Sequence, residues 1–325
     1  MGTETTAATE TPANLPASAD AILAAKDATA GLINLPAGVE LNEAQAQKME
    51  AEKSVRLIVV AGAIDCGKTT LLSSIYEMFQ LGPIDKKQFA GCDTFPAFEK
   101  KCHLGRTDSG NQEEDTVRNA YEGPNPEYVH LKLQNGAKAL GHIEFLFTDV
   151  SGEMFEHARN STDECKKLEF LRRAAHVLIF LDCDKLLQPT KRWGMIKDAR
   201  SLIQSCLDSE MLSPDCFVTV VWAKVDMIEA AKGKDNSAAK ELMEQVEHEF
   251  REAFGDRIKN LKFHRTAARP NFYPALKFGF GVHELMDDWV MKTLPTSKSD
   301  GVAVLREDAE TSALQPPTPA LGSPQ

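Results

Sequence analysis

One stretch of the sequence decides the fold: Leu57-Ile58-Val59-Val60-Ala61-Gly62-Ala63-Ile64-Asp65-Cys66-Gly67-Lys68-Thr69-Thr70-Leu71-Leu72. Its first residues form an aliphatic run that is typical of a buried strand, and the run breaks at Gly62. An amphipathic helix is predicted to begin near Lys68. Between them, the residues from Gly62 to Thr69 follow the pattern G-x-x-x-x-G-K-[ST] without a departure. Because a strand precedes this pattern and a helix follows it, the stretch predicts a phosphate-binding loop.

The chemistry of phosphate binding explains why these residue types stand at these positions. The two glycines let the backbone curl, so that consecutive N–H groups and the N-terminus of the helix point at a phosphate. Lys68 can reach the outer phosphates, and the Thr69 hydroxyl can ligate the Mg²⁺ that bridges them. Contacts to a nucleotide are expected along the whole loop, from Gly62, Ala63, Ile64, Asp65, Cys66, Gly67, Lys68, Thr69 and Thr70.

The composition of the chain narrows the class of protein. Its 325 residues are 42% hydrophobic and 26% charged, which is typical of a globular protein with a sizeable core. The formal net charge of −11 disfavours broad nucleic-acid binding, and no apolar run is long enough to span a bilayer. Seven scattered cysteines without a C-x-x-C pair favour a reducing compartment. We therefore expect a cytoplasmic protein with neither a nucleic-acid partner nor a membrane span.

Strands and helices are predicted to alternate along the chain. Alternating apolar residues predict a half-exposed strand at 128–133, in a hairpin with 143–150, and continuous apolar runs predict buried parallel strands. Strands are expected at 55–61, 128–133, 143–150, 176–182, 216–222 and 261–266, and helices at 42–53, 68–79, 193–208, 238–254 and 281–293. The pattern predicts an α/β fold of the P-loop NTPase type, with a mostly parallel sheet, one antiparallel hairpin strand and helices on both faces.

The same reading divides the chain into three regions. Residues 1–50 are rich in Ala, Thr and Glu and are expected to form a flexible arm. Residues 51–295 form the nucleotide-binding domain, with a long insert at about 80–127 that carries turn signals but no strong period. Residues 296–325 are rich in Ser and Pro and are expected to be disordered.

A second motif, Asp149-Val150-Ser151-Gly152, follows the second strand of the predicted hairpin. An acidic residue at this place can hold Mg²⁺ through the water shell of the ion. The backbone N–H of Gly152 can approach the γ-phosphate. We therefore expect Asp149 and Gly152 to face the outer phosphates.

Two further motifs follow the later strands. In Ala223-Lys224-Val225-Asp226, the carboxylate of Asp226 can accept two hydrogen bonds from guanine N1 and N2, which adenine cannot supply. The aliphatic stem of Lys224 can cover the base plane. In Thr266-Ala267-Ala268, a backbone N–H can meet guanine O6, although an ordinary strand-to-loop junction would look the same.

The order of these four motifs, from Gly62 to Ala268, resembles that of the P-loop GTPases, and the first is similar to the loop of translation-factor-like members. Asp149-Val150-Ser151-Gly152-Glu153-Met154-Phe155, with the segment 94–118, is more narrowly similar to bacterial double-GTPase proteins. The resemblance implies GTP as the ligand, Mg²⁺ as the cofactor, and a protein partner, a second GTPase, in conflict or antiphage systems.

Two residues depart from the GTPase pattern. The Asn that usually precedes the Lys of the guanine motif is Ala223, so its amide contacts to base and loop are missing. Glu153 stands where many hydrolytic members carry Gln or His. A carboxylate facing the γ-phosphate is repelled unless it is protonated or swung away, so hydrolysis is expected to be slow. His157 could substitute for the missing residue, or could simply be a surface histidine.

The resemblance also implies a threonine that closes on Mg²⁺ and the γ-phosphate ahead of the hairpin. Thr94, Thr107 and Thr116 lie in the insert, and we choose Thr116 because it is nearest to the strand at Tyr128. The expected metal ligands are then Thr69, Asp149 and Thr116, and the expected catalytic residues are Lys68, Thr116 and Glu153. Arg106 or Arg118 would be an arginine finger in cis, unless these arginines only pair with nearby acids.

These features predict a GTP-binding switch that hydrolyses GTP slowly. The water would attack the γ-phosphate in line, with Lys68, Mg²⁺ and backbone N–H groups neutralising the developing charge. One alternative is an ATPase of the same fold, since Ala223 weakens the guanine motif. The other is a non-catalytic nucleotide-binding scaffold, in which the insert is a docking surface for another protein.

Overall fold

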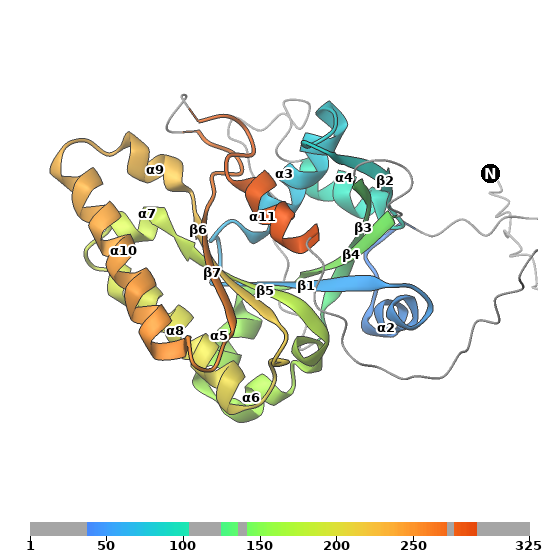
Figure 1. Cartoon of the computed structure of the whole chain (residues 1–325), viewed down its shortest axis with the longest axis horizontal. Helices are drawn as coiled ribbons and strands as arrows, with labels where there is room; N and C mark the ends of the chain where they lie inside the picture. Colours follow the sequence, from blue (N-terminus) through green and yellow to red (C-terminus); the bar gives the residue numbers. More distant parts are fainter. Residues whose placement is uncertain (1–37, 104–124, 136–141, 272–275, 291–325) are drawn as a thin grey trace, which may run out of the picture. The chain divides into compact units, whose positions relative to one another are not determined.

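The computed structural model describes residues 38–103, 125–135, 142–271 and 276–290 (Figure 1). The chain divides into two units, Met1–Met291 and Lys292–Gln325, and the second unit lies outside the described residues together with the expected Ser/Pro-rich tail. No helix among the described residues is long and apolar enough to cross a membrane.

A seven-stranded sheet forms the centre of the first unit, in the order β2-β3-β4-β1-β5-β6-β7. Only β3 runs against its neighbours, because it pairs antiparallel with both β2 and β4, while the other pairings are parallel. The strands are β1 (Val55–Ala61), β2 (Lys87–Gly91), β3 (Glu127–Asn135), β4 (His142–Asp149), β5 (Ala174–Asp182), β6 (Phe217–Ala223) and β7 (Asn260–Arg265). The predicted fold class, a mostly parallel sheet with one antiparallel strand, is confirmed.

Helices cover both faces of the sheet (Figure 1), because alternate residues of β1 are buried in two separate cores. Leu57, Val59 and Ala61 pack with α2, α5, α8 and α10, whereas Ile58 and Val60 pack with α3, α4 and α11. The helices are α2 (Glu43–Glu52), α3 (Lys68–Leu81), α4 (Phe95–His103), α5 (Gly152–Asn160), α6 (Thr162–Lys166), α7 (Cys183–Leu187), α8 (Arg192–Asp208), α9 (Val225–Ala230), α10 (Lys234–Phe254) and α11 (Val282–Val290), with a 3-10 turn at Glu169–Arg173.

The N-terminal segment differs from the flexible arm that we expected to reach residue 50. Leu41 pairs with Tyr128 through two backbone hydrogen bonds of 2.9 Å, which adds a bridge to β3. Asn42 caps α2 in a capping box with Gln45, and Ala46 is fully buried against the sheet. Residues 38–52 therefore belong to the folded unit, because one helix turn buries an apolar residue that composition alone conceals.

The insert also holds structure that its sequence did not predict. Strand β2 pairs with β3 at the edge of the sheet, and α4 packs beside α3. Stacking of Tyr76 on Phe98, with ring centroids 5.2 Å apart, joins the two helices. The segments are short, and the partners that stabilise them are distant in sequence, so no local period marks them.

One buried residue of β5 has no polar partner among the described residues. His176 is 0% exposed, stacks on Phe217 with ring centroids 4.9 Å apart, and has no hydrogen-bond partner at either ring nitrogen. Burial, and then the positive charge of Arg56, lower the pKa of His176 to about 4, with Lys262 lowering it further and Asp288 opposing. The side chain is therefore neutral at pH 7 and behaves as a core residue.

We expect His176 to make folding stability depend on pH. Its pKa is about 4 in the folded state and 6.5 in the reference state, so between these values the unfolded chain takes up a proton that the native chain excludes. Stability is therefore lost as the pH falls, by about 2 kcal/mol at pH 5 and about 3 kcal/mol below pH 4. Urea unfolding of His176→Leu at pH 7.5 and pH 5 should show a smaller loss than the wild type. The matched variant His248→Leu, at an exposed histidine of α10, should keep the wild-type loss, and equal losses in both variants would contradict the assignment.

Candidate functional site

The residues from Gly62 to Gly67 form a loop between β1 and α3, as the sequence predicts. Gly62, Asp65 and Gly67 have positive φ angles of 155°, 60° and 98°. A Cβ at Gly62 would lie 2.8 Å from the Cys66 Sγ and 2.9 Å from the Phe180 Cβ, so only glycine fits there. The Lys68 Nζ donates to the carbonyl oxygens of Gly62 (3.1 Å) and Ala63 (2.9 Å), which lays the lysine across the loop.

The second motif lies directly against this loop. A Cβ added to Gly152 would lie 2.5 Å from the backbone nitrogen of Ile64 and 2.7 Å from the carbonyl carbon of Ala63. The end of β4 and the start of α5 are therefore in backbone contact with the phosphate-binding loop. Ser151 caps α5, and its Oγ accepts from the backbone N–H of Glu153 at 3.3 Å. Glu153 itself is exposed.

Asp149 ends β4 at the same edge of the sheet, but another residue already pairs with its carboxylate. The Nζ of Lys101, from α4, forms an ion pair with Asp149 Oδ2 and a second one with Glu40 Oε1 at 3.0 Å. Burial alone would lower the pKa of Lys101, but the negative charges of Asp149 and Glu40 outweigh burial and raise it. The ammonium therefore stays charged between the two carboxylates.

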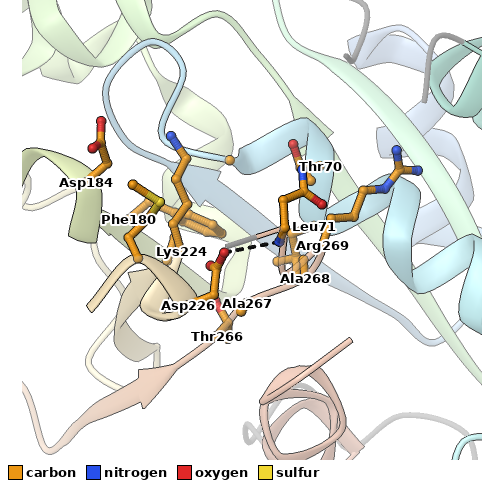
Figure 2. Close-up of a pocket in the computed structure, with 14 residues that line it drawn as sticks. Thr70, Leu71, Phe180, Asp184, Lys224, Asp226, Thr266, Ala267, Ala268 and Arg269 are labelled. Carbon is orange, nitrogen blue, oxygen red and sulfur yellow. Dashed lines mark hydrogen bonds between the residues drawn. The ribbon is translucent and has the colours of Figure 1, made fainter. Parts of the chain in front are cut away.

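A cavity of about 390 Å³ opens beside the loop, where β5, β6 and β7 end (Figure 2). Gly67 and Thr70 line its phosphate-loop end, and the guanine-motif residues line the other. The complete lining is Gly67, Thr70, Leu71, Phe180, Asp184, Ala223, Lys224, Asp226, Met227, Thr266, Ala267, Ala268, Arg269 and Asn271. The first, third and fourth predicted motifs thus meet at one cavity, because parallel strands place their carboxyl ends at one edge.

Lys224 crosses the space between the cavity and the loop. Its Nζ donates to the Asp65 carbonyl oxygen at 2.8 Å and pairs with Asp182 Oδ2 at 2.9 Å. Its backbone adopts a left-handed conformation, with φ 60° and ψ 40°, at the start of α9. Both ends of the side chain are fixed, so its aliphatic stem forms part of the cavity wall.

Asp226 is buried at the base end of the cavity, and its Oδ2 accepts from the backbone N–H of Asn271 at 3.2 Å (Figure 2). Of the three amides in the fourth motif, Thr266 N–H donates to the Trp222 carbonyl at 2.8 Å and Ala267 N–H donates to the Phe280 carbonyl at 3.0 Å. These bonds hold two of the amides in the fold. Ala268 is therefore the candidate amide donor to a base.

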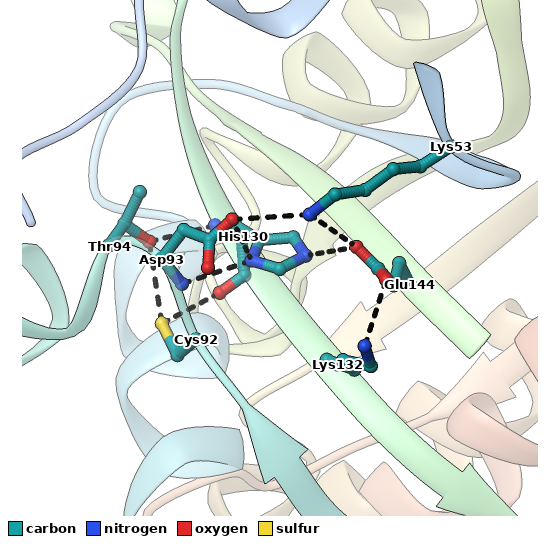
Figure 3. Close-up of polar contacts among 7 residues, drawn as sticks. All are labelled: Lys53, Cys92, Asp93, Thr94, His130, Lys132 and Glu144. Atoms are coloured by element: carbon teal, nitrogen blue, oxygen red, sulfur yellow. Dashed lines mark hydrogen bonds and ion pairs between the residues drawn. The ribbon is translucent and has the colours of Figure 1, made fainter. Parts of the chain in front are cut away.

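The expected threonine of the insert, Thr116, lies outside the described residues, as do Thr107, Arg106 and Arg118. Thr94 is described, and it is fully buried, with its Oγ1 accepting from the backbone N–H of His130 at 2.8 Å (Figure 3). This bond makes Thr94 part of a structural cluster. His157, which we considered in place of the Gln or His that this chain lacks at position 153, lies on the exposed face of α5.

Several residues of the site carry no signal in the sequence. Lys101 pairs with Asp149 and Glu40 from a segment without a motif. Asp182 pairs with the cavity residue Lys224, and Arg269 lines the cavity and pairs with Glu77. An Asp that ends a buried strand could have singled out Asp182. For Lys101 no such pattern exists, because a lysine on an amphipathic helix ordinarily faces solvent.

Comparison with known proteins supports the resemblance seen in the motifs. The family model for Double-GTPase 2 matches residues 56–290, which is most of the chain. Among curated proteins, no sequence matches the chain. Among solved structures, the chain is similar to the GDP-bound RocCORdC fragment of Methanosarcina barkeri Roco2, with 13% identity and a TM-score of 0.35. The alignment covers 73% of this chain and 49% of that one, so the chain spans about half the length of the Roco2 fragment.

The four motifs therefore stand in the order and the fold that a GTPase requires, and the family match covers all of them. The chain belongs to the Double-GTPase 2 family, and its folded unit is a P-loop GTPase domain.

Proposed function

We propose that this chain is a GTP-binding switch that hydrolyses GTP slowly. The observation that carries the proposal is the continuity of the site, because Gly67 of the phosphate-binding loop and Thr70 in the first turn of α3 both line the cavity that also contains Asp226. A nucleoside triphosphate can therefore place its phosphates on the loop and its base beside Asp226 in one extended pose.

The base end favours guanine over adenine. A carboxylate offers two oxygens and about four acceptor sites, so Asp226 can accept from guanine N1 and N2 as well as from the Asn271 N–H. Adenine offers no such pair of donors. Ala223 lies behind the loop, with its Cβ 4.0 Å from the Cβ position of Gly67, so an Asn amide here would be close enough to reach the loop. Its absence lowers the expected affinity without changing the preference.

The phosphate end supports binding more strongly than fast turnover. Lys68, the loop N–H groups and the N-terminus of α3 supply positive charge for a γ-phosphate. Glu153 lies in the first turn of α5, but a carboxylate beside the loop repels the γ-phosphate instead of orienting a water. An in-line attack would therefore proceed without a well-placed residue to position the water, and slow hydrolysis is expected.

The residues as arranged do not fit a divalent ion at Asp149. Thr69 stands at the start of α3, as an Mg²⁺ ligand would, but the Asp149 carboxylate is neutralised by Lys101. Within the described residues, no group of three or more His, Cys, Asp or Glu side chains could hold a metal ion. Mg²⁺ binding by Thr69 and Asp149 therefore requires a different position of Lys101.

A protein partner and a cytoplasmic location complete the proposal. A switch needs a second protein that reads its nucleotide state, and the family resemblance favours another GTPase. The seven cysteines are free thiols, and six of them are buried, as expected in a reducing compartment. Size-exclusion chromatography of candidate pairs with GTPγS and with GDP would test for a complex that depends on the nucleotide.

We expect the Asp226→Ala variant to lose guanine selectivity. Two hydrogen bonds to a buried carboxylate disappear, so the affinity for GTPγS should fall by about 100-fold or more, as measured by calorimetric titration. ATPγS, which makes no such bonds, should bind weakly to both proteins. The control is Asp256→Ala, at an exposed aspartate beyond α10, which should bind GTPγS like the wild type. Equal wild-type affinities for GTPγS and ATPγS would disprove guanine recognition and favour an ATPase.

Ala223→Asn should have the opposite effect. Restoring the amide beside the loop adds one or two neutral hydrogen bonds, so GTPγS should bind about two- to tenfold more tightly. The same calorimetric titration checks this expectation. An affinity that is unchanged or weaker would mean that this edge of the cavity does not meet the base.

Single-turnover hydrolysis separates a slow GTPase from a scaffold. Phosphate release from bound GTP should be slow in the wild type and absent in Lys68→Ala, which lacks the charge for the γ-phosphate. Glu153→Gln should raise the rate by roughly tenfold, because an amide can orient the water without repelling the phosphate. Wild-type release no faster than that of Lys68→Ala, with GTP bound, would favour the scaffold.

A further inference from the structure

Lys101 is a buried lysine that lies between two carboxylates. Its side chain is 4% exposed, and the Asp149 side chain that it contacts is 2% exposed. Lysine is rarely buried unless it is paired, and here the ammonium is shared between two carboxylates from different parts of the chain. The pair lies at the carboxyl edge of the sheet, where β4 ends at Asp149, close in sequence to the Gly152 that contacts the phosphate-binding loop.

The surroundings of this ammonium carry an excess of negative charge. Glu127 stands opposite Asp149 in the β3–β4 register, so Glu40, Glu127 and Asp149 gather around Lys101. Lys100 also acts on Glu40 and Glu127, so three carboxylates and two ammonium groups leave a formal charge of −1 when all are ionised. A divalent cation at Asp149 would be attracted electrostatically, and Lys101 would then lose one of its two ion-pair partners.

Helix α4, which carries Lys101, is held at its start by two sets of contacts. The first is a polar cluster in which His130 accepts from the Asp93 N–H at 3.0 Å and contacts Glu144 at 3.2 Å, with Lys53 between Asp93 and Glu144 (Figure 3). The second is a hydrogen bond of 3.0 Å from the Ala97 N–H to the Gly38 carbonyl. The N-terminal segment therefore contacts α4 twice, through the Gly38 carbonyl and through the Glu40 carboxylate.

We propose that Lys101 competes with Mg²⁺ for Asp149, so that loading of the Mg²⁺–triphosphate requires Lys101 to leave this carboxylate. The inference rests on the proposed function, because it assigns the metal side of the same nucleotide site. Its consequence is that the position of α4, and through Glu40 that of the N-terminal segment, reports whether the site holds the metal. A segment outside the four motifs thereby becomes part of the switch.

Lysine acylation followed by mass spectrometry tests this in the full wild-type chain. The protein is treated with an acetylating ester without nucleotide, with GTPγS and EDTA, and with GTPγS and Mg²⁺, after calorimetry has shown saturation. Lys101 should be protected in the first two states, and its labelling rate should rise at least tenfold in the third. Lys100, the exposed neighbour on the same helix, is the internal control and should label similarly throughout.

A variant provides the second test. Lys101→Met frees Asp149, so the Mg²⁺ concentration for half-maximal GTPγS binding should fall at least tenfold, whereas Lys100→Met should match the wild type. Adding Asp149→Asn to Lys101→Met should remove the gain. Binding of Mg²⁺–GTPγS with Lys101 still protected would overturn the inference alone, as would an unchanged Mg²⁺ requirement in folded Lys101→Met. Calorimetric silence toward GTPγS would overturn the proposed function and this inference with it.

Discussion

The site depends on the absence of a side chain at position 152. With any larger residue, the Cβ would lie 2.5 Å from the backbone nitrogen of Ile64, inside the phosphate-binding loop. This contact brings the start of α5, just after β4, against the loop that leaves β1, so the residues flanking Gly152 lie at a fixed place relative to this loop. Asp149 and Ser151 are held further by contacts of their own, through the Lys101 ion pair and the cap of α5. A shift of either segment would therefore move the other.

Charged residues from distant parts of the chain lie close together at this same edge of the sheet. Lys224 links Asp182 to the loop, and Lys101 links Asp149 to Glu40 of the N-terminal segment. Both lysines pair with an aspartate at the end of a strand, Asp182 at the end of β5 and Asp149 at the end of β4. The Lys101–Asp149 pair is buried, and such pairs contribute little net stability, but removing one partner is costly because the other stays charged. They are consequently suited to making one arrangement of the loop distinct from another.

Much of the candidate site was predictable from local patterns. The loop, the aspartates at 149 and 226 and the lysine at 224 each follow a strand whose aliphatic composition is visible in the sequence, so the strand ends locate them. The fourth motif was predicted as a group, but hydrogen bonds to Trp222 and Phe280 engage two of its amides. Such assignments cannot come from sequence, because the acceptors lie on a neighbouring strand and on a later loop.

The sequence by itself determined the α/β class, the order of the motifs, the loop geometry that two glycines permit and the weakness of the guanine motif at Ala223. These properties reside in contiguous residues, where periodicity and residue type report directly on the backbone. Only the tertiary structure decided that residues 38–52 fold onto the sheet, that the insert adds β2 and α4, and that Lys101 forms an ion pair with Asp149. Each of these depends on contacts between segments tens of residues apart. Burial of a single alanine or lysine leaves no hydrophobic period in a sequence. Tertiary packing alone therefore determines which charged residues form ion pairs.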